Sequence, residues 1–434
     1  MEGPQKNNDN HESYSYFRSM NRNVKLVFLF VIFQSFGRGI WAGNVLSTYI
    51  FYIAGESYST LGIISSATGL TMTLVVFPAG HFADKLGRDI ILRTSAIFGL
   101  ISVIILALGN SVESIVVSLI FWGLFLGMSR PSLEALFADS VMSRARSKIY
   151  AWRHFAQNVS MAAGPFVNVA LFKIFGNEWK LPILKSVMYF GLAISGLSLF
   201  LIFFMSDEYT LGDDSEAVEM DKESTEKNRS TNFHLKLPSK ARYVPYILLV
   251  SNLIIGIGAG MTVKYFPLFF IKIYDLKPIS VQVIMGTTSI FTGFSGPITQ
   301  RFSIKKGRAQ LIFIVQTLAI VCLYLIALYP PVYFVIPLFI ARGSLMNASQ
   351  PLSRSIIMDL VPKRYRGKWN SIEAIAWGLF WNISAAIGGF LIGPNDNFRL
   401  VFLTTASIYA VGTALVLLIF PLVPSEIYEN KKNQ

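Results

Sequence analysis

Cysteine and histidine are scarce in this sequence. Cys322 is the single cysteine among 434 residues, and the four histidines are scattered without an H-x-x-x-H pair. One thiol cannot build a disulfide framework or a multi-cysteine metal or redox motif. The histidine spacing gives no basis for a zinc hydrolase site, and no nucleotide-binding loop or nucleophile–base constellation stands out. The sequence therefore predicts a protein that is not an enzyme and that has no metal site and no cofactor.

Charged residues are also few. They make up 15% of the chain, whereas hydrophobic residues make up 53% and the mean hydropathy is +0.50. Soluble domains carry about 25% charged residues. The net charge of +13 would suggest nucleic acid as the partner of a soluble protein. Because this chain is so apolar, its charges instead indicate on which side of a bilayer each segment lies. We therefore expect a multi-pass integral membrane protein that binds no nucleic acid.

Long apolar runs recur along the chain, and each membrane-spanning helix needs about 20 such residues. The runs lack the alternation of strands, so they predict helices. We expect twelve transmembrane helices in two six-helix bundles, at 24–53, 59–80, 90–109, 114–138, 149–175, 183–205, 244–271, 279–299, 309–329, 331–358, 370–393 and 399–422.

Lysine and arginine predict the orientation, because they concentrate in cytosolic segments. With both termini in the cytosol, 27 of the 38 basic residues fall on the cytosolic side. The sequence then divides into a disordered N-terminal segment, a first bundle, a charged and disordered cytosolic linker, a second bundle and a cytosolic tail. These parts are residues 1–23, 24–205, 206–243, 244–422 and 423–434.

The two bundles are related by an internal repeat, which indicates a duplicated six-helix unit. Pro131, Asp139, Arg144, Arg146 and Lys148 recur 220 residues later as Pro351, Asp359, Arg364, Arg366 and Lys368. The glycine-rich stretch 39–43 of the first span also has a counterpart, which we expect at 256–260 of the seventh.

The loop after the second span reads Gly80-x-x-x-Asp84-Lys85-x-Gly87-Arg88. This pattern resembles the signature loop of the major facilitator superfamily, and the resemblance extends over the whole membrane portion. It implies two bundles that rock about a substrate bound between them near the midplane. Gly80 is expected to let helices approach closely. The resemblance also implies a cytosolic conformational latch, formed here by Gly80, Asp84, Gly87, Arg88, Asp139, Arg146, Asp359 and Arg366.

Ionisable groups within a membrane are costly and are usually functional. Five basic residues and one acid fall inside the predicted spans: Arg38, Arg130, Lys264, Arg342, Arg354 and Glu134. Arg130 and Glu134 are four residues apart on one helix, so we expect them to neutralise each other. Glu134 is also a titratable group, and this pair is our candidate for ion coupling.

Arg38 and Arg342 lie near the bilayer centre without an acid at their depth. Two such guanidinium groups need an anion, carbonyl groups or water as partners. An anionic substrate would supply that charge. We therefore predict a substrate site that contains Arg38 and Arg342 with polar and aromatic neighbours on several spans, namely Gln34, Trp41, Gln157, Asn158, Lys264, Gln350, Trp377 and Trp381.

These residues favour a secondary active or facilitative transporter of a small organic solute, which we expect to be an anion. Its partners would be that solute, a co-transported or exchanged ion, and the lipid bilayer, and we expect a monomer. Two alternatives stay open: a proton-coupled exporter of drugs or amphiphiles, and a non-transporting sensor on the same scaffold. The sequence does not distinguish the plasma membrane from an organelle membrane.

Overall fold

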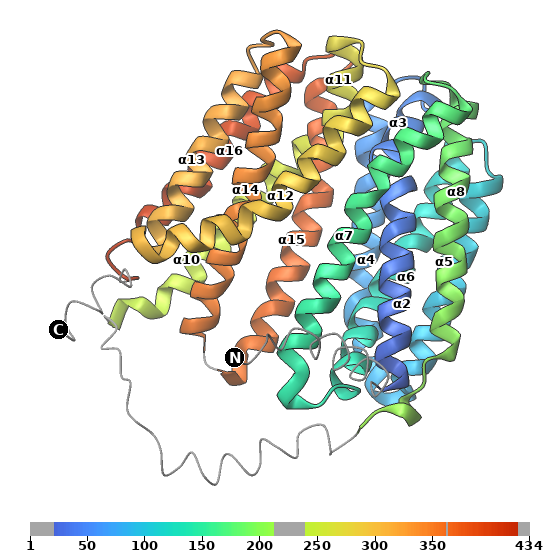
Figure 1. Cartoon of the computed structure of the whole chain (residues 1–434), viewed down its shortest axis with the longest axis vertical. Helices are drawn as coiled ribbons and strands as arrows, with labels where there is room; N and C mark the ends of the chain where they lie inside the picture. Colours follow the sequence, from blue (N-terminus) through green and yellow to red (C-terminus); the bar gives the residue numbers. More distant parts are fainter. Residues whose placement is uncertain (1–20, 212–238, 362, 424–434) are drawn as a thin grey trace, which may run out of the picture.

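The computed structural model describes residues 21–211, 239–361 and 363–423, and no β-strand occurs among them. The helices stand side by side in a tall bundle (Figure 1). Most of the predicted N-terminal segment, the linker from 212 to 238 and the tail from 424 onward lie outside the described residues. The prediction of an all-helical membrane fold is confirmed. The predicted domain boundaries remain predictions.

The first half of the chain forms six rod-shaped helical segments, which we call rods. The first rod is interrupted, and the last ends in a 3₁₀ turn. Its elements are α2 (Arg22–Trp41), α3 (Asn44–Ile53), α4 (Tyr58–Leu86), α5 (Arg88–Leu108), α6 (Val112–Asp139), α7 (Ser143–Phe175), α8 (Leu181–Phe200), η1 (Leu201–Phe204) and η2 (Asp207–Tyr209).

The second half repeats this arrangement. Its elements are η4 (Ser239–Tyr243), α10 (Val244–Thr262), η5 (Val263–Tyr265), α11 (Phe266–Tyr274), α12 (Pro278–Lys306), α13 (Arg308–Ile326), α14 (Val332–Leu360), α15 (Lys363–Ile392) and α16 (Phe398–Leu417). We call the end of the bundle where α2 begins and α16 ends the termini end, and the opposite end the far end (Figure 1).

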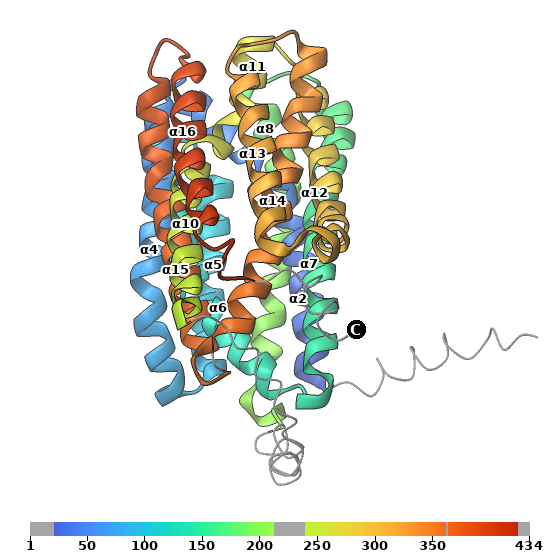
Figure 2. The ribbon, with the colours of Figure 1, turned by 90° about the vertical axis from the view of Figure 1, so that its left-hand side faces the viewer.

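Ten segments in the described residues are long and apolar enough to cross a membrane. The continuous stretch 241–274 counts as one of them. α12 and α15 fall outside this set, although they contain 29 and 30 residues and run alongside the other helices (Figure 2). The chain is thus a multi-pass membrane protein, and the count of twelve spans stays a prediction.

The first rod of each half is interrupted, where the sequence suggested continuous helices at 24–53 and 244–271. The breaks lie between α2 and α3 and at η5. Close helix crossings flank both. A Cβ at Gly39 would overlap the backbone of Met161 and Gly164 on α7, and one at Gly260 would overlap Trp381 and Ser384 on α15.

These crossings correct the predicted repeat in the first rods. Met161 and Gly164 correspond to Trp381 and Ser384 at a spacing of 220, so the counterpart of Gly39 is Gly260, which follows at 221. The match of 39–43 to 256–260 is therefore shifted. Glycine composition alone cannot reveal which glycine a neighbouring backbone touches.

Two equivalent ion pairs tie helices together at the termini end. Arg88 at the start of α5 pairs with Asp139 at the end of α6, and Arg308 pairs with Asp359 at 2.5 Å. Both pairs keep the 220-residue spacing. Each pair lies within one half, so in this structure they fasten the halves internally.

Gly87 has a φ of +101°, which favours glycine where α4 turns into α5. Gly80 does not act as expected, because no described atom lies within 4 Å of a Cβ built there. Its helix face meets no close neighbour in this conformation. The side chains of the other three predicted latch residues, Asp84, Arg146 and Arg366, lie outside the described part of the structure.

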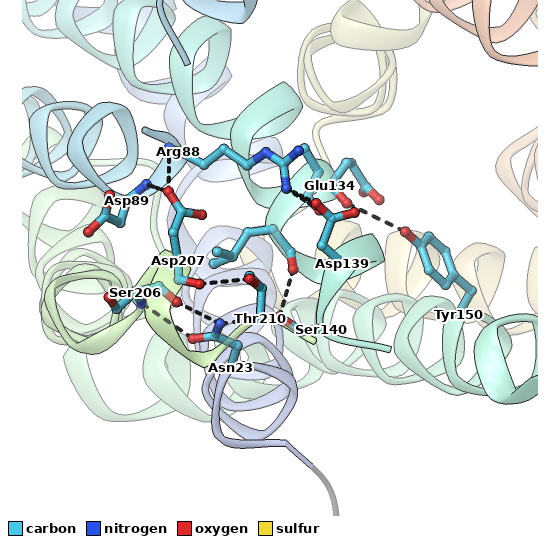
Figure 3. Close-up of polar contacts among 12 residues, drawn as sticks. Asn23, Arg88, Asp89, Glu134, Asp139, Ser140, Tyr150, Ser206, Asp207 and Thr210 are labelled. Carbon is cyan, nitrogen blue, oxygen red and sulfur yellow. Dashed lines mark hydrogen bonds and ion pairs between the residues drawn. The ribbon is translucent and has the colours of Figure 1, made fainter. Parts of the chain in front are cut away.

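The start of the linker folds back on the first half (Figure 3). Asp207 Oδ2 accepts hydrogen bonds from the backbone N–H groups of Arg88 at 2.7 Å and Asp89 at 3.3 Å. This carboxylate therefore caps the N-terminus of α5, where unpaired N–H groups and the helix dipole favour an anion. Asn23 Nδ2 also donates to the backbone oxygen of Ser206 at 2.8 Å.

The halves meet along two helix pairs, α4 with α15 and α7 with α12 (Figure 2). Hydrogen bonds and one ion pair cross this seam toward the far end. They join Tyr58 to Asp396, Glu56 to Lys272, Ser66 to Asn382, Asn168 to Gln282, Asn177 to Ile279 and Trp179 to Leu276. The far end is thus held closed by contacts between halves.

Candidate functional site

A cavity of about 430 Å³ lies on the termini side of this seam. This volume is in the range of roughly 300–1,000 Å³ typical of small-molecule sites. The lining comes from α6 in the first half and from six elements of the second half, α10, η5, α13, α14, α15 and α16. The lining residues are Arg130, Asn252, Ile255, Ala259, Val263, Gln316, Arg342, Met346, Asn347, Ser349, Gln350, Arg354, Glu373, Gly378, Trp381 and Tyr409.

Arg342 on α14 is buried, with 5% of its surface exposed. Its Cζ lies 5.0 Å from the ring centre of Phe266 and 5.7 Å from that of Tyr409. Nη2 donates to the Tyr409 hydroxyl at 2.8 Å, whereas Nε has no hydrogen-bond partner among the described atoms. Aromatic faces offset part of the cost of burying a cation but supply no counter-charge. Arg342 thus lines the cavity as a buried cation whose hydrogen bonding is incomplete among the described atoms.

The aromatic side chains beside Arg342 pack together across helices of the second half. Phe266 on α11 stacks on Phe402 of α16 at 5.1 Å and packs against Phe339 of α14 at 4.6 Å. The repeat shows that the fold does not require a cation here. At the equivalent position the first half has Trp122, which packs edge-on against Trp41 at 5.1 Å. Arg342 therefore stands at a position where the first half has an aromatic side chain that packs against another ring.

The predicted neutralisation of Arg130 by Glu134 is wrong. Glu134 forms an ion pair with Arg153 on α7 instead. Arg153 also lies over the ring of Phe137, with its Cζ 4.8 Å from the ring centre. A helix neighbour four residues away competes with partners on adjacent helices, and here the adjacent helix supplies the closer charge. Arg130 is left exposed to the cavity.

A second pair of charges mirrors Glu134 and Arg153 with the signs exchanged. Adding 220 to their numbers gives Arg354 on α14 and Glu373 on α15, and both line the cavity. No ion pair between them is present in the described structure. The Glu373 carboxylate instead accepts a hydrogen bond of 3.4 Å from Asn252 Nδ2 on α10.

Arg38 does not line the cavity, yet it lies close enough to Arg130 for their charges to repel each other. Its Nε is buried without a hydrogen-bond partner among the described atoms. The structure therefore does not place Arg38 beside Arg342, as the prediction of a joint site supposed. Arg38 instead adds positive charge near Arg130 in the first half.

Other predicted site residues divide into two groups. Gln350 and Trp381 line the cavity with Arg342. Gln34 and Trp41 pack inside the first half, where Gln34 accepts from Ser198 at 2.8 Å and Trp41 donates to Ser195 at 2.9 Å. These two residues face α8 rather than the cavity. The sequence could not reveal this, because both sides of α2 are apolar and residue spacing does not show which side faces the other half.

Lys264 on η5 donates to Asn382 Oδ1 at 3.1 Å, away from the cavity lining. On α7, the side chain of Gln157 is partly exposed and that of Asn158 is exposed, and neither is among the residues that line the cavity. The side chain of Trp377 lies outside the described part of the structure.

Sequence reasoning missed five uncharged polar residues that line the cavity, Asn252, Gln316, Asn347, Ser349 and Tyr409. Glu373, which also lines the cavity, is likewise absent from the predicted site. Glu373 could have been found from the repeat, since it occupies the position equivalent to Arg153. Tyr409 and Gln316 carry no signal in the sequence, because buried tyrosine and glutamine are common in packed spans.

The lining combines guanidinium groups with apolar surface. Ile255, Ala259, Val263 and Met346 line the same space as the arginines. Such a wall suits a small organic molecule that has an apolar body and an anionic group. Among the described residues, no group of three or more His, Cys, Asp or Glu side chains could hold a metal ion.

Relatives with curated functions match part of the chain. It is 27% identical over 148 residues to the quinolone resistance protein NorA of Staphylococcus aureus, which covers 34% of this chain and 37% of NorA. It is 30% identical over 156 residues to the 4-hydroxybenzoate transporter PcaK of Acinetobacter baylyi, which covers 36% of this chain and 33% of PcaK. The matched region thus spans about a third of the length of each relative.

Solved structures of transporters share the fold. A D-xylose–proton symporter superposes with a TM-score of 0.69 at 15% identity, covering 93% of this chain and 98% of the symporter. The nucleoside transporter NupG superposes with a TM-score of 0.68 at 13% identity, covering 92% and 99% of the two chains. The family model described as Major Facilitator Superfamily matches residues 27–341 and 248–434. The two halves, their repeat and this match together identify the chain as a member of the major facilitator superfamily.

Proposed function

We propose that the chain is a transporter that carries a small organic anion across a membrane and binds it at Arg342. The observation that supports this most strongly is Arg342, which is buried, lines the cavity and has incomplete hydrogen bonding at Nε among the described atoms. A buried cation without an acidic partner is costly. A carboxylate or phosphate from the substrate would accept from it in a charge-assisted, bidentate geometry.

The position of the cavity favours transport over simple binding. It lies between α6 of one half and the helices of the other, so an occupant would touch both halves. In this proposal the termini end faces the cytosol, as the basic residues predict, and the seam closes the far end. Rocking of the halves about the bound anion would then expose it on the opposite side.

A panel of ligands tests this proposal. The full chain, purified in detergent, is melted in the presence of carboxylates, phosphate esters, hydrophobic cations and neutral solutes. A ligand that binds the folded state raises the apparent melting temperature by mass action. We expect stabilisation by anions in the wild type and none in Arg342→Gln. Arg242→Gln, which removes an exposed cation away from the cavity, is the matched control and should respond as the wild type does.

Two other outcomes would replace the proposal. Stabilisation by hydrophobic cations would favour an exporter of drugs, a possibility that the partial similarity to NorA keeps in view. Anion binding without transport in proteoliposomes would favour a membrane sensor on the same scaffold. Anion binding that is unchanged in Arg342→Gln would place the site elsewhere.

A further inference from the structure

The charges that line the cavity do not balance. Three arginines and one glutamate face it, Arg130, Arg342, Arg354 and Glu373. Two positive charges are therefore left over among the described lining residues. In a bundle surrounded by lipid, uncompensated charge is expensive, so the cavity should attract anions in proportion to this excess.

The repeat indicates which of the arginines are left over. Arg354 and Glu373 occupy the positions of the ion-paired Glu134 and Arg153 with the signs exchanged. No ion pair joins them in the described structure, but their opposite charges cancel in the sum over the lining residues. Counting them as a neutral couple leaves Arg342 on the second half and Arg130 on the first half, one cation for each half.

No ion pair with Arg130 is present among the residues that the structure describes. Its helix neighbour Glu134 is engaged by Arg153, and its electrostatic neighbour Arg38 is another cation. The counterpart of Arg130 in the repeat is Gln350, which also lines the cavity. The second half thus presents a neutral amide where the first half presents a charge, so the positive charge on that wall is a property of this site and not of the fold.

The two leftover cations lie at different heights. Gln350, which shares the level of Arg130, is eight residues from Arg342 along α14, or about 12 Å at 1.5 Å per residue. This is the separation of the two backbone levels, so a single carboxylate contacts both guanidinium groups only when both arginine side chains extend toward it. Two anionic groups at opposite ends of one small molecule contact both without that constraint.

We propose that the substrate is an organic dianion, a dicarboxylate or a phosphorylated carboxylate, whose two anionic groups bind Arg342 of one half and Arg130 of the other. This inference rests on the proposed function and narrows its substrate class. Such a molecule bridges the two halves through charge. A monoanion of the same skeleton would bind at Arg342 and leave Arg130 without a partner.

Matched ligand pairs test the inference on the full chain in detergent. The dissociation constants of hexanoate and adipate, and of benzoate and terephthalate, are measured by titration calorimetry in a buffer of low anion content. In the wild type we expect each diacid to bind at least about tenfold more tightly than its monoacid, which corresponds to one additional charge-assisted contact.

Variants separate the roles of the two cations. Arg130→Gln should remove the preference for diacids, and it should lower the affinity for monoacids less than the affinity for diacids, because a monoacid loses only the long-range attraction of the Arg130 charge. Arg130→Lys should retain part of the preference because the charge remains. Arg242→Gln should change neither affinity.

Three results would overturn the inference. Equal affinity for diacids and monoacids in the wild type would do so while leaving the proposed anion site intact, provided that Arg342→Gln still abolishes both. A diacid preference that persists in Arg130→Gln would assign the second contact to another residue. If none of the four acids binds, the inference is contradicted, and the proposed function is then decided by the wider panel of carboxylates and phosphate esters.

Discussion

Glu134 on α6 forms an ion pair with Arg153 on α7, and this pairing leaves Arg130 exposed to the cavity one turn away. The pair is partly buried, since 12% of the Arg153 side chain and 51% of the Glu134 side chain are exposed. Its loss is therefore expected to cost more than a surface ion pair but less than a fully buried one.

A double-mutant cycle measures this pair. Glu134→Gln and Arg153→Gln should each lower stability, and the double variant should lose no more than the worse single variant, because both remove the same interaction. We expect a coupling energy of about 1 kcal/mol, given the half-exposed carboxylate. Melting temperatures of the four proteins give the cycle, and strictly additive losses would show that the two residues do not interact.

Asp207 caps α5 from outside the helix, through the N–H groups of Arg88 and Asp89. Asp207→Ala should reduce stability by about 1 kcal/mol, as the loss of an N-cap does. Glu208→Ala is the matched control, because it removes an exposed carboxylate from the adjacent position. Thermal melting distinguishes the two. If both variants melt at the same temperature, the cap makes no net contribution.

The crossing of α2 and α7 depends on glycine at both helices. A Cβ at Gly164 would overlap the backbone of Gly39, which cannot move aside as a flexible side chain could. Gly164→Ala should destabilise the protein by about 1–3 kcal/mol, the usual cost of overpacking. Gly293→Ala on α12 should cost nothing, because no described atom lies within 4 Å of that position. Equal melting temperatures for the two variants would refute the close crossing.

Contacts across the seam hold the far end closed, and the hydroxyl of Tyr58 donates to Asp396 there. Tyr58→Phe removes this bond while keeping the ring, so the population open at the far end should rise. Spin labels on Asn110 and Leu328, two exposed far-end positions on different halves, report the opening in a Cys322→Ser background. A distance distribution identical to that of the parent would show that this bond does not control the far end.

Much of the architecture is predictable from apolar runs. In lipid the backbone N–H and C=O groups of each run must form hydrogen bonds within that run, which requires a helix. The repeat follows from charged and proline positions at a constant spacing, which locates Asp139 and Asp359 correctly at equivalent helix ends. The interruptions at 42–43 and 263–265 escape such reasoning. A broken helix remains apolar on both sides of its break, so hydropathy does not change there.

The site was harder to predict for two physical reasons. Spacing on one helix suggests that Glu134 faces Arg130, but partner choice depends on the adjacent helix, and α7 supplies Arg153. Periodicity also cannot orient a helix that is apolar all round. Gln34 and Trp41 therefore turned out to face α8, whereas Arg342 and Gln350 face the cavity.

Transport through the cavity at Arg342 is the central claim, and uptake into proteoliposomes tests it most directly. The full chain is reconstituted, and uptake of a radiolabelled anion that stabilises the protein is compared among the wild type, Arg342→Gln and Arg242→Gln. The account predicts saturable uptake by the wild type and by Arg242→Gln, with at least about a tenfold loss in Arg342→Gln, as expected when a charge-assisted contact is removed. Uptake by Arg342→Gln at the wild-type rate and half-saturation would contradict it.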